Sequence, residues 1–345
     1  MKRFLSREFK LALAASFAAA ALLGSCAKAA KAADPLSVAV FVPGVASGNP
    51  IYEMLVAGAE KAVAETPGAS IKVIEAGHDQ SAWLDSLRDT VASGEFGLIV
   101  SSNPSLPELC AKLTGDYPAI RFIVADAYLP GNPAIHTVLY NQKEQGYIVG
   151  YLAALVTKAR SPGAPPAAGM VVAQRYPTLD RLIIPGFEAG LRAVDPGFSL
   201  QLREVGNWYD SAKAAELAGS LYGSGVEVIL PIAGGGGQGV VAAAKERGKS
   251  VVWFDGAGYS LDPVAVVGCA TVAQDRLVYE RLKAALGGDG SIYGRADIVS
   301  ARDGYVGFDA EGAGYAALPA DIRAGLEAAL AGLASGSPDF SFDTF

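Results

Sequence analysis

The segment Trp208–Phe254 has the sequence WYDSAKAAELAGSLYGSGVEVILPIAGGGGQGVVAAAKERGKSVVWF, and its pattern indicates the fold class. Apolar residues recur at helical spacing in Ser211–Tyr222 and Gln238–Arg247. Val226–Leu230 and Ser250–Phe254 are short runs rich in β-branched residues, which are typical of buried strands. Strands that alternate with such helices pair in parallel, because each helix returns the chain to the same end of the sheet.

The same alternation extends over most of the chain. The expected strands are Ser37–Val42, Ile71–Glu75, Gly97–Ser101, Ile120–Ala125, Thr137–Tyr140, Gly169–Ala173 and Leu200–Val205. The expected helices are Tyr52–Glu65, Trp83–Ser93, Pro107–Thr114, Glu144–Lys158, Asp180–Ala193 and Pro319–Leu333. The sequence therefore predicts an α/β protein with two lobes, each built on a parallel sheet that helices cover on both faces. Ligands bind such sheets at the carboxyl ends of the strands.

The N-terminus has the features of a bacterial lipoprotein signal. A basic head, MKRFLSREFK, precedes the apolar run Leu11–Leu23 and the small residues Gly24 and Ser25, and Cys26 follows. As a helix the run would be roughly 20 Å long, too short for a bilayer core of about 30 Å. We expect residues 1–25 to be removed, Cys26 to be lipidated and residues 26–35 to form a tether at the extracytoplasmic face of the membrane. An uncleaved membrane anchor is the alternative.

The charge balance excludes one class of partner. The formal net charge of the chain is −7. Four basic residues and one acidic residue leave with the signal, so the mature chain carries −10. An acidic body repels the phosphate backbone, and we expect no nucleic-acid partner.

Few residues are available for catalysis or for a metal. Besides Cys26 the chain has only Cys110 and Cys269, which are expected to be two buried free thiols, although a disulfide between them stays open. The two histidines, His78 and His136, stand apart from each other and from the cysteines. We therefore expect that the protein has no metal site, no nucleophilic triad and no resident cofactor, and that it is not an enzyme.

The glycine run Gly234–Gly239 permits two interpretations. Gly234, Gly236 and Gly239 satisfy the dinucleotide-binding pattern G-x-G-x-x-G, and Asp255 follows 21 residues after Gly234. This keeps an enzyme with a nucleotide cofactor as an alternative. We favour a simpler role, in which the amides of Gly234 and Gly235 approach a ligand closely at a helix N-terminus.

Acids and aromatic rings collect in the loops that follow strands. Asp126 and Asp255 each end an apolar strand, where a carboxylate can accept hydrogen bonds from ligand hydroxyls or can cap a turn. The aromatic residues in these loops are Tyr52, Trp83, Tyr128, Tyr140, Tyr176, Trp208, Tyr209 and Tyr259. Stacking on such rings contributes about 0.5–1.5 kcal/mol per pair beyond the area buried. The loops therefore favour a flat ligand with hydroxyl groups.

Several passages carry a resemblance to a known family. They are YPAIRFIVADA (Tyr117–Ala127), QKEQGYIVGYLAALVTK (Gln142–Lys158), IPGFEAGLRAVDPG (Ile184–Gly197), Trp208–Lys249 and DGYVGFDAEG (Asp303–Gly312). With them the chain resembles the basic membrane protein family, the purine-nucleoside-receptor-like lipoproteins that serve ABC importers. The resemblance implies a type I periplasmic-binding-protein fold, with two Rossmann-like lobes, three crossovers, closure on one ligand and an ABC permease as partner. It also implies that Asp255 holds ribose hydroxyls.

Two departures from the family bear on the ligand. The loop Gly44–Tyr52 (GVASGNPIY) lacks the aspartate that the family usually has there. The lysine of the family's nucleoside receptors falls near Val272–Ala273 and is absent. Loss of an acid and a base argues against a purine nucleoside, and the aromatic loops favour the larger ring of riboflavin, as in the spirochaetal riboflavin-binding branch. A nucleoside, a sugar or an amphiphilic signalling molecule stays as an alternative.

These considerations define a candidate site and a division of the chain. The ring is expected between Tyr52, Tyr140, Tyr176 and Trp208, with hydroxyls on Asp126 and Asp255 and neutral hydrogen bonds from Asn103, Asn141 and Gln174. Crossovers are expected near Tyr140–Asn141, Asp255–Gly256 and Gly290–Arg295. They divide the chain into a first lobe, 36–140 plus 256–290, and a second, 141–255 plus 291–345. We expect a monomer.

Overall fold

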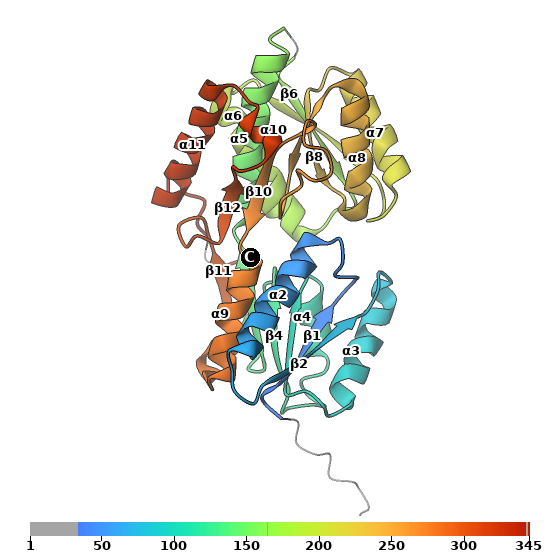
Figure 1. The fold of residues 1–345 in the computed structure, drawn as a ribbon, viewed down its shortest axis with the longest axis vertical. Coiled ribbons are helices and arrows are strands. Elements are labelled where there is room, and N and C mark those ends of the chain that lie inside the picture. The colour runs from blue at the N-terminus through green and yellow to red at the C-terminus, as the bar shows by residue number, and fades with distance from the viewer. Residues whose placement is uncertain (1–33, 164, 343) are drawn as a thin grey trace, which may run out of the picture.

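The computed structural model describes residues 34–163, 165–342 and 344–345. The predicted signal, the lipidation site Cys26 and all but the last two residues of the predicted tether lie outside the described residues. Two lobes are stacked along the longest axis, each with a central sheet and flanking helices, and the C-terminus lies between them (Figure 1).

The first lobe contains a six-stranded parallel sheet in the order β11-β5-β4-β3-β1-β2. Its strands are β1 (Ser37–Val42), β2 (Ser70–Glu75), β3 (Leu98–Ser102), β4 (Arg121–Ala125), β5 (Ile135–Tyr140) and β11 (Ala296–Val299). Its helices are α2 (Pro50–Ala64), α3 (Trp83–Ala92), α4 (Leu106–Ala111) and α9 (Gln274–Leu286). Alternate residues of β1 enter different cores, Val38 and Val40 with Leu55 of α2, and Ala39 and Phe41 with Leu87 of α3.

The second lobe contains six strands in the order β12-β10-β9-β8-β6-β7, with β12 antiparallel to β10. Its strands are β6 (Ala167–Val172), β7 (Ser199–Glu204), β8 (Val228–Ile232), β9 (Ser250–Trp253), β10 (Val266–Val272) and β12 (Val306–Asp309). Its helices are α5 (Gln142–Arg160), α6 (Ile184–Val194), α7 (Ser211–Gly223), α8 (Gly237–Arg247), α10 (Ala313–Ala316) and α11 (Ala320–Ser335). Helices α7 and α8 cover one side of the sheet, and α5, α6, α10 and α11 lie on the other (Figure 1).

Glycines bring α5 and α6 into backbone contact. A Cβ atom on Gly186 of α6 would lie 2.1 Å from the carbonyl oxygen of Lys143, and one on Gly150 of α5 would lie 2.2 Å from that of Phe187. No other residue fits at these positions without separating the helices. This contact fixes the start of α5, which lies at the boundary of the lobes.

The chain crosses between the lobes three times, as the resemblance implies. The crossings lie at Asn141 between β5 and α5, at Ala273 between β10 and α9, and at residues 300–305 between β11 and β12. The predicted second and third crossovers, and the ranges 256–290 and 291–345 that depend on them, are therefore wrong. Strand β10 belongs to the second lobe and β11 to the first.

The predicted lobe boundaries are wrong for a physical reason. No helix separates β9 from β10, so the chain returns across the second lobe through turns and breaks the strand–helix alternation on which the division depended. Strand β11 pairs in parallel with β5, with Ala296 opposite Thr137, and becomes the edge strand of the first sheet.

Cys110 of α4 and Cys269 of β10 are buried free thiols in different lobes, which confirms the prediction of two thiols. Within the described part of the chain, no helix is long and apolar enough to span a membrane.

Candidate ligand-binding site

One aspartate stands at a strand end in each lobe, where the lobes meet. Asp126 directly follows β4, and Asp255 follows β9 after one residue. Their φ angles are 52° and 68°, and they are the only non-glycine residues with positive φ among those that the structure describes. This backbone conformation is less favourable for a residue with a side chain than for glycine, although Asp tolerates it better than most, and such residues cluster at functional sites. Both side chains are partly buried.

Two glutamines on the first turn of α5 hold these aspartates. The Nε2 of Gln142 donates to Asp126 Oδ1 at 3.0 Å, and the Nε2 of Gln145 donates to Asp255 Oδ1 at 3.0 Å. Residues three apart lie on one face of a helix, so a single turn contacts both acids. Because α5 belongs to the second lobe, the Gln142–Asp126 hydrogen bond joins the lobes. Both glutamines are buried.

The two acids lie close enough to influence each other. Desolvation raises the pKa of Asp255 to about 6. The pKa of Asp126 is raised well above its ordinary value, first by desolvation and then by the charge of Asp255. Within the described residues, no lysine or arginine bonds to either carboxylate. The site therefore presents hydrogen-bond acceptors and no compensating cation.

An aromatic pair from the second lobe lies beside the acids. Tyr176 follows β6 and Trp208 follows β7, and their ring centroids are 5.8 Å apart with planes inclined at 51°. Burial raises the pKa of the Tyr176 hydroxyl well above its ordinary value, and the charges of Asp255 and Asp126 raise it further, so this hydroxyl lies near both acids. The indole Nε1 of Trp208 is buried without a hydrogen-bond partner.

The first lobe contributes a third aromatic residue, which lies near Asp126. The hydroxyl of Tyr52, near the start of α2, donates to the Pro43 carbonyl oxygen at 3.2 Å. Desolvation raises the pKa of Tyr52 to about 12, while a hydrogen bond with Asn103 lowers it and the charge of Asp126 raises it. Tyr52, Asn103 and Asp126 thus form the first lobe's part of the site.

The other predicted residues are placed differently. Tyr140 is fully buried, and its hydroxyl donates to Gln274 Oε1 at 3.4 Å, where Ser102 Oγ also donates at 2.9 Å. Asn141 Nδ2 donates to the carbonyl oxygen of residue 340 at 3.2 Å, and its Oδ1 is buried without a partner. Gln174 follows β6 and is half-buried. Burial raises the pKa of the Tyr140 hydroxyl well above its ordinary value, and the charges of Asp126 and Asp255 raise it further, so this hydroxyl also lies near both acids while it bonds to Gln274.

The glycine run packs against the segment that carries Trp208. A Cβ atom on Gly234, which has a φ of 55°, would lie 3.0 Å from the Trp208 carbonyl oxygen, and the amide of Gly236 donates to the same oxygen at 3.3 Å. A Cβ atom on Gly239 would lie 1.9 Å from the Ser211 carbonyl oxygen. Gly234 and Gly235 are exposed beside Trp208. Packing against residues 208–211 thus accounts for Gly234 and Gly239, whereas a Cβ atom on Gly235 would make only ordinary contacts.

The C-terminal residues connect the lobes, which the sequence patterns did not predict. The ring of Phe345 lies edge-on to Tyr128 of the first lobe at 6.2 Å and 5.5 Å from the guanidinium of Arg181 in the second. Phe340 packs against Tyr147 of α5 with centroids 5.2 Å apart. The glutamines of α5 were also missed, although their i, i+3 spacing at a helix start was a usable signal.

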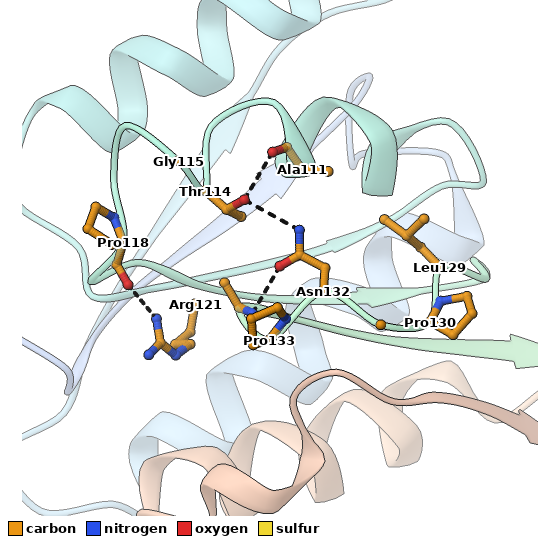
Figure 2. A pocket seen from close by; sticks show the side chains of 11 residues that line it. Ala111, Thr114, Gly115, Pro118, Arg121, Leu129, Pro130, Asn132 and Pro133 are labelled. Carbon is orange, nitrogen blue, oxygen red and sulfur yellow. Dashed lines mark hydrogen bonds between the residues drawn. The ribbon is translucent and has the colours of Figure 1, made fainter.

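A surface cavity of about 520 Å³ lies elsewhere on the first lobe, beside the starts of β4 and β5 (Figure 2). Its polar groups bond to one another, Asn132 Nδ2 to Thr114 Oγ1 at 3.3 Å and Arg121 to the Pro118 carbonyl oxygen at 2.8 Å (Figure 2). None of the predicted site residues lines it. Among the residues that the structure describes, no cluster of His, Cys, Asp or Glu is arranged to hold a metal.

Comparison with solved structures supports the fold. A solute-binding protein of an ABC transporter from Aeropyrum pernix superposes with a TM-score of 0.73 over 87% of this chain and 92% of its own, at 20% identity. A solute-binding protein from Conexibacter woesei gives a TM-score of 0.64 over 89% and 98%, at 20% identity. The fold is therefore that of the type I periplasmic binding proteins.

Sequence comparison identifies the family. The CD4+ T-cell-stimulating antigen of Listeria monocytogenes is 27% identical over 49% of this chain and 46% of its own length. The ABC transporter nucleoside-binding protein BmpA of Lactococcus lactis is 26% identical over 45% and 42%. The matches span about half the length of these relatives. Residues 36–320 match the family described as ABC transporter substrate-binding protein PnrA-like, which is a family of binding proteins and not of enzymes. The chain therefore belongs to the PnrA-like, or basic membrane protein, family of ABC transporter substrate-binding proteins.

Proposed function

We propose that this protein binds riboflavin, or a closely related neutral flavin, between its lobes and delivers it to an ABC permease. The proposal depends on one observation: Asp126 and Asp255 lie near each other beside Tyr176 and Trp208, and no lysine or arginine in the described part of the chain bonds to either acid. The ribityl hydroxyls and the ring imide of riboflavin are hydrogen-bond donors that suit these acceptors. Its flat ring suits the aromatic side chains.

Binding requires the lobes to move apart and close again. A Cβ atom on Gly256 of the second lobe would lie 3.0 Å from the Cβ of Pro50 in the first, so the lobes touch in this structure. The Gln142–Asp126 hydrogen bond also spans them. A ligand enters when these contacts open, and its donors then replace part of them as the lobes close. The permease would recognise the closed form.

A purine nucleoside is the second candidate, and a relative favours it. BmpA of Lactococcus lactis is named a nucleoside-binding protein. A nucleoside also offers ribose hydroxyls to Asp255. The second crossover argues against a nucleoside. Val272 and Ala273 occupy the region where the family's nucleoside receptors have a lysine. The next residue, Gln274, accepts hydrogen bonds from Tyr140 and Ser102.

Titration of the purified protein tests the proposal. Riboflavin, guanosine and inosine are added in turn while Trp fluorescence is recorded, and dissociation constants are measured by calorimetry. We expect riboflavin to bind at micromolar concentration or below and to quench Trp208. Tight binding of guanosine without riboflavin binding would establish the nucleoside alternative, and no binding of any of the three would refute the proposal.

We also propose that Cys26 carries the lipid that holds the protein at the extracytoplasmic face of the membrane. The position lies outside the described residues, and the sequence GSC after an apolar run supports it. The variant Cys26→Ala is expected to leave the membrane fraction for the soluble fraction after export. Cys110→Ala, which alters a buried thiol, is the matched control and should stay with the membrane. Retention of Cys26→Ala in the membrane would contradict the assignment.

A further inference from the structure

The side chain of Gln145 has an acceptor that the protein does not use. The residue is 0% exposed. Its Nε2 donates to Asp255 Oδ1 at 3.0 Å and to the Ala270 carbonyl oxygen at 3.4 Å, which occupies both amide hydrogens. Its Oε1 is buried and has no hydrogen-bond partner. A buried acceptor without a partner is destabilising, so its presence beside Asp255 requires an explanation.

The backbone on both sides of this hydrogen bond is held in place. A Cβ atom on the next residue, Gly146, would lie 2.6 Å from the Ile183 carbonyl oxygen, so this turn of α5 is in backbone contact with the segment leading into α6. Asp255 is fixed in turn by its left-handed backbone conformation, with a φ of 68°. The hydrogen bond between the two side chains keeps them together. In this arrangement Gln145 Oε1 is unpaired beside a carboxylate whose second oxygen accepts no hydrogen bond from the described residues.

We propose that Gln145 is a specificity-determining residue that, together with Asp255, recognises two neighbouring hydrogen-bond donors on the ligand. Adjacent hydroxyl groups, as in a ribose or a ribityl chain, can donate one hydrogen to Asp255 and one to Gln145 Oε1. A ligand with a single hydroxyl there leaves one buried acceptor unpaired and is rejected. The inference rests on the proposed function, since it names the part of the ligand that this end of the site selects.

A purely structural role for Gln145 predicts a different result. If the residue only oriented Asp255, its loss would weaken all ligands that reach Asp255 by the same factor. If it recognises a second hydroxyl, its loss weakens the ligand with two hydroxyls and spares the ligand that lacks one. The ratio of two dissociation constants separates these roles, whereas a single constant does not.

The experiment measures this ratio by calorimetry on the full chain for two ligand pairs. The pairs are guanosine with 2′-deoxyguanosine, and riboflavin with a deoxyriboflavin that lacks one ribityl hydroxyl, so that both members of each pair can still reach Asp255. We expect the wild-type protein to prefer the hydroxylated member of the pair that it binds, and Gln145→Met, a near-isosteric change, to reduce this preference by about tenfold. Gln201→Met is the matched control, because Gln201 of β7 accepts a hydrogen bond from Ser224 and is not part of the site, so its loss should leave the ratio unchanged.

The experiment separates a failure of the Gln145 proposal from a failure of the proposed function. If the wild-type protein binds neither pair, the proposed function fails. If it binds a pair with a preference that Gln145→Met leaves intact, the specificity role of Gln145 is refuted while the proposed function stands. If Gln145→Met does not fold by circular dichroism, Gln145→Asn replaces it, because the shorter amide cannot reach both Asp255 and the ligand.

Discussion

Replacement of Asp255 by asparagine is expected to stabilise the ligand-free protein while removing its ligand binding. Desolvation raises the pKa of Asp255 from its ordinary value of 3.8 to about 6. At about 1.4 kcal/mol per pKa unit this shift costs the folded state ~3 kcal/mol at neutral pH, and hydration of the partly exposed side chain reduces the figure to about 1–3 kcal/mol. Asparagine has no charge to desolvate, and its Oδ1 can still accept the hydrogen bond of Gln145.

The pH dependence of the free energy of unfolding shows why Asp255→Asn is expected to be stabilising. Because the pKa is higher in the folded than in the unfolded state, the wild-type protein loses stability as the pH rises from about 4 to about 6 and stays at the lower value above that range. The Asp255→Asn protein does not lose stability over this pH range, because asparagine does not ionise. Removal of the Asp255 charge also lowers the pKa of Asp126 toward its ordinary value, and this further stabilises the variant at neutral pH. The advantage of Asp255→Asn is therefore largest at pH 7.5 and shrinks at pH 4.5.

Urea unfolding of both proteins at pH 7.5 and pH 4.5, without ligand, measures the difference in the free energy of unfolding. Asp289→Asn is the control, because Asp289 is exposed and accepts hydrogen bonds from Ser291 that hold its pKa below the ordinary value. It should give no gain at either pH. An Asp255→Asn variant that is no more stable than the wild type at pH 7.5, or whose advantage is the same at both pH values, would refute the electrostatic reasoning.

Three further changes test other parts of the structure. Gly186→Ala, whose Cβ would lie 2.1 Å from the Lys143 carbonyl oxygen, should lower the free energy of unfolding in urea by about 1–3 kcal/mol, whereas Gly223→Ala, with no atom within 4 Å, should leave it nearly unchanged. Phe345→Ala removes a ring that contacts both lobes and should broaden the distance distribution between spin labels placed one on each lobe; an unchanged distribution would contradict a bridging role. Trp208→Phe keeps an aromatic ring but removes the unpartnered indole donor, so calorimetry should show riboflavin binding weakened by about three- to tenfold; unchanged affinity would exclude that donor from the site.

The candidate site was predictable where it depended on strand ends. Asp126 and Asp255 follow apolar strands, and the fold brings both to the boundary of the lobes together with Tyr52, Tyr176 and Trp208. Tyr140 follows the same pattern, yet its hydroxyl bonds to Gln274, which no local pattern links to it. The i, i+3 spacing of the α5 glutamines was a local signal, but their partners Asp126 and Asp255, like the contacts of Phe345, lie far away in the chain and could not be predicted from it.

Sequence patterns alone were enough to predict the α/β class, the two lobes and the strand ends that carry the acids, because hydrophobic periodicity and strand length are local properties. The lobe that β10 and β11 join could be found only from the folded chain, since a strand's partner depends on the path of the loop before it and on which sheet edge is free. Folding also brings the two acids close enough for the charge of Asp255 to raise the pKa of Asp126, with no lysine or arginine among the described residues bonded to either carboxylate. Their pKa values depend on burial and on a charge across the lobe boundary, and these arise only when distant segments pack together.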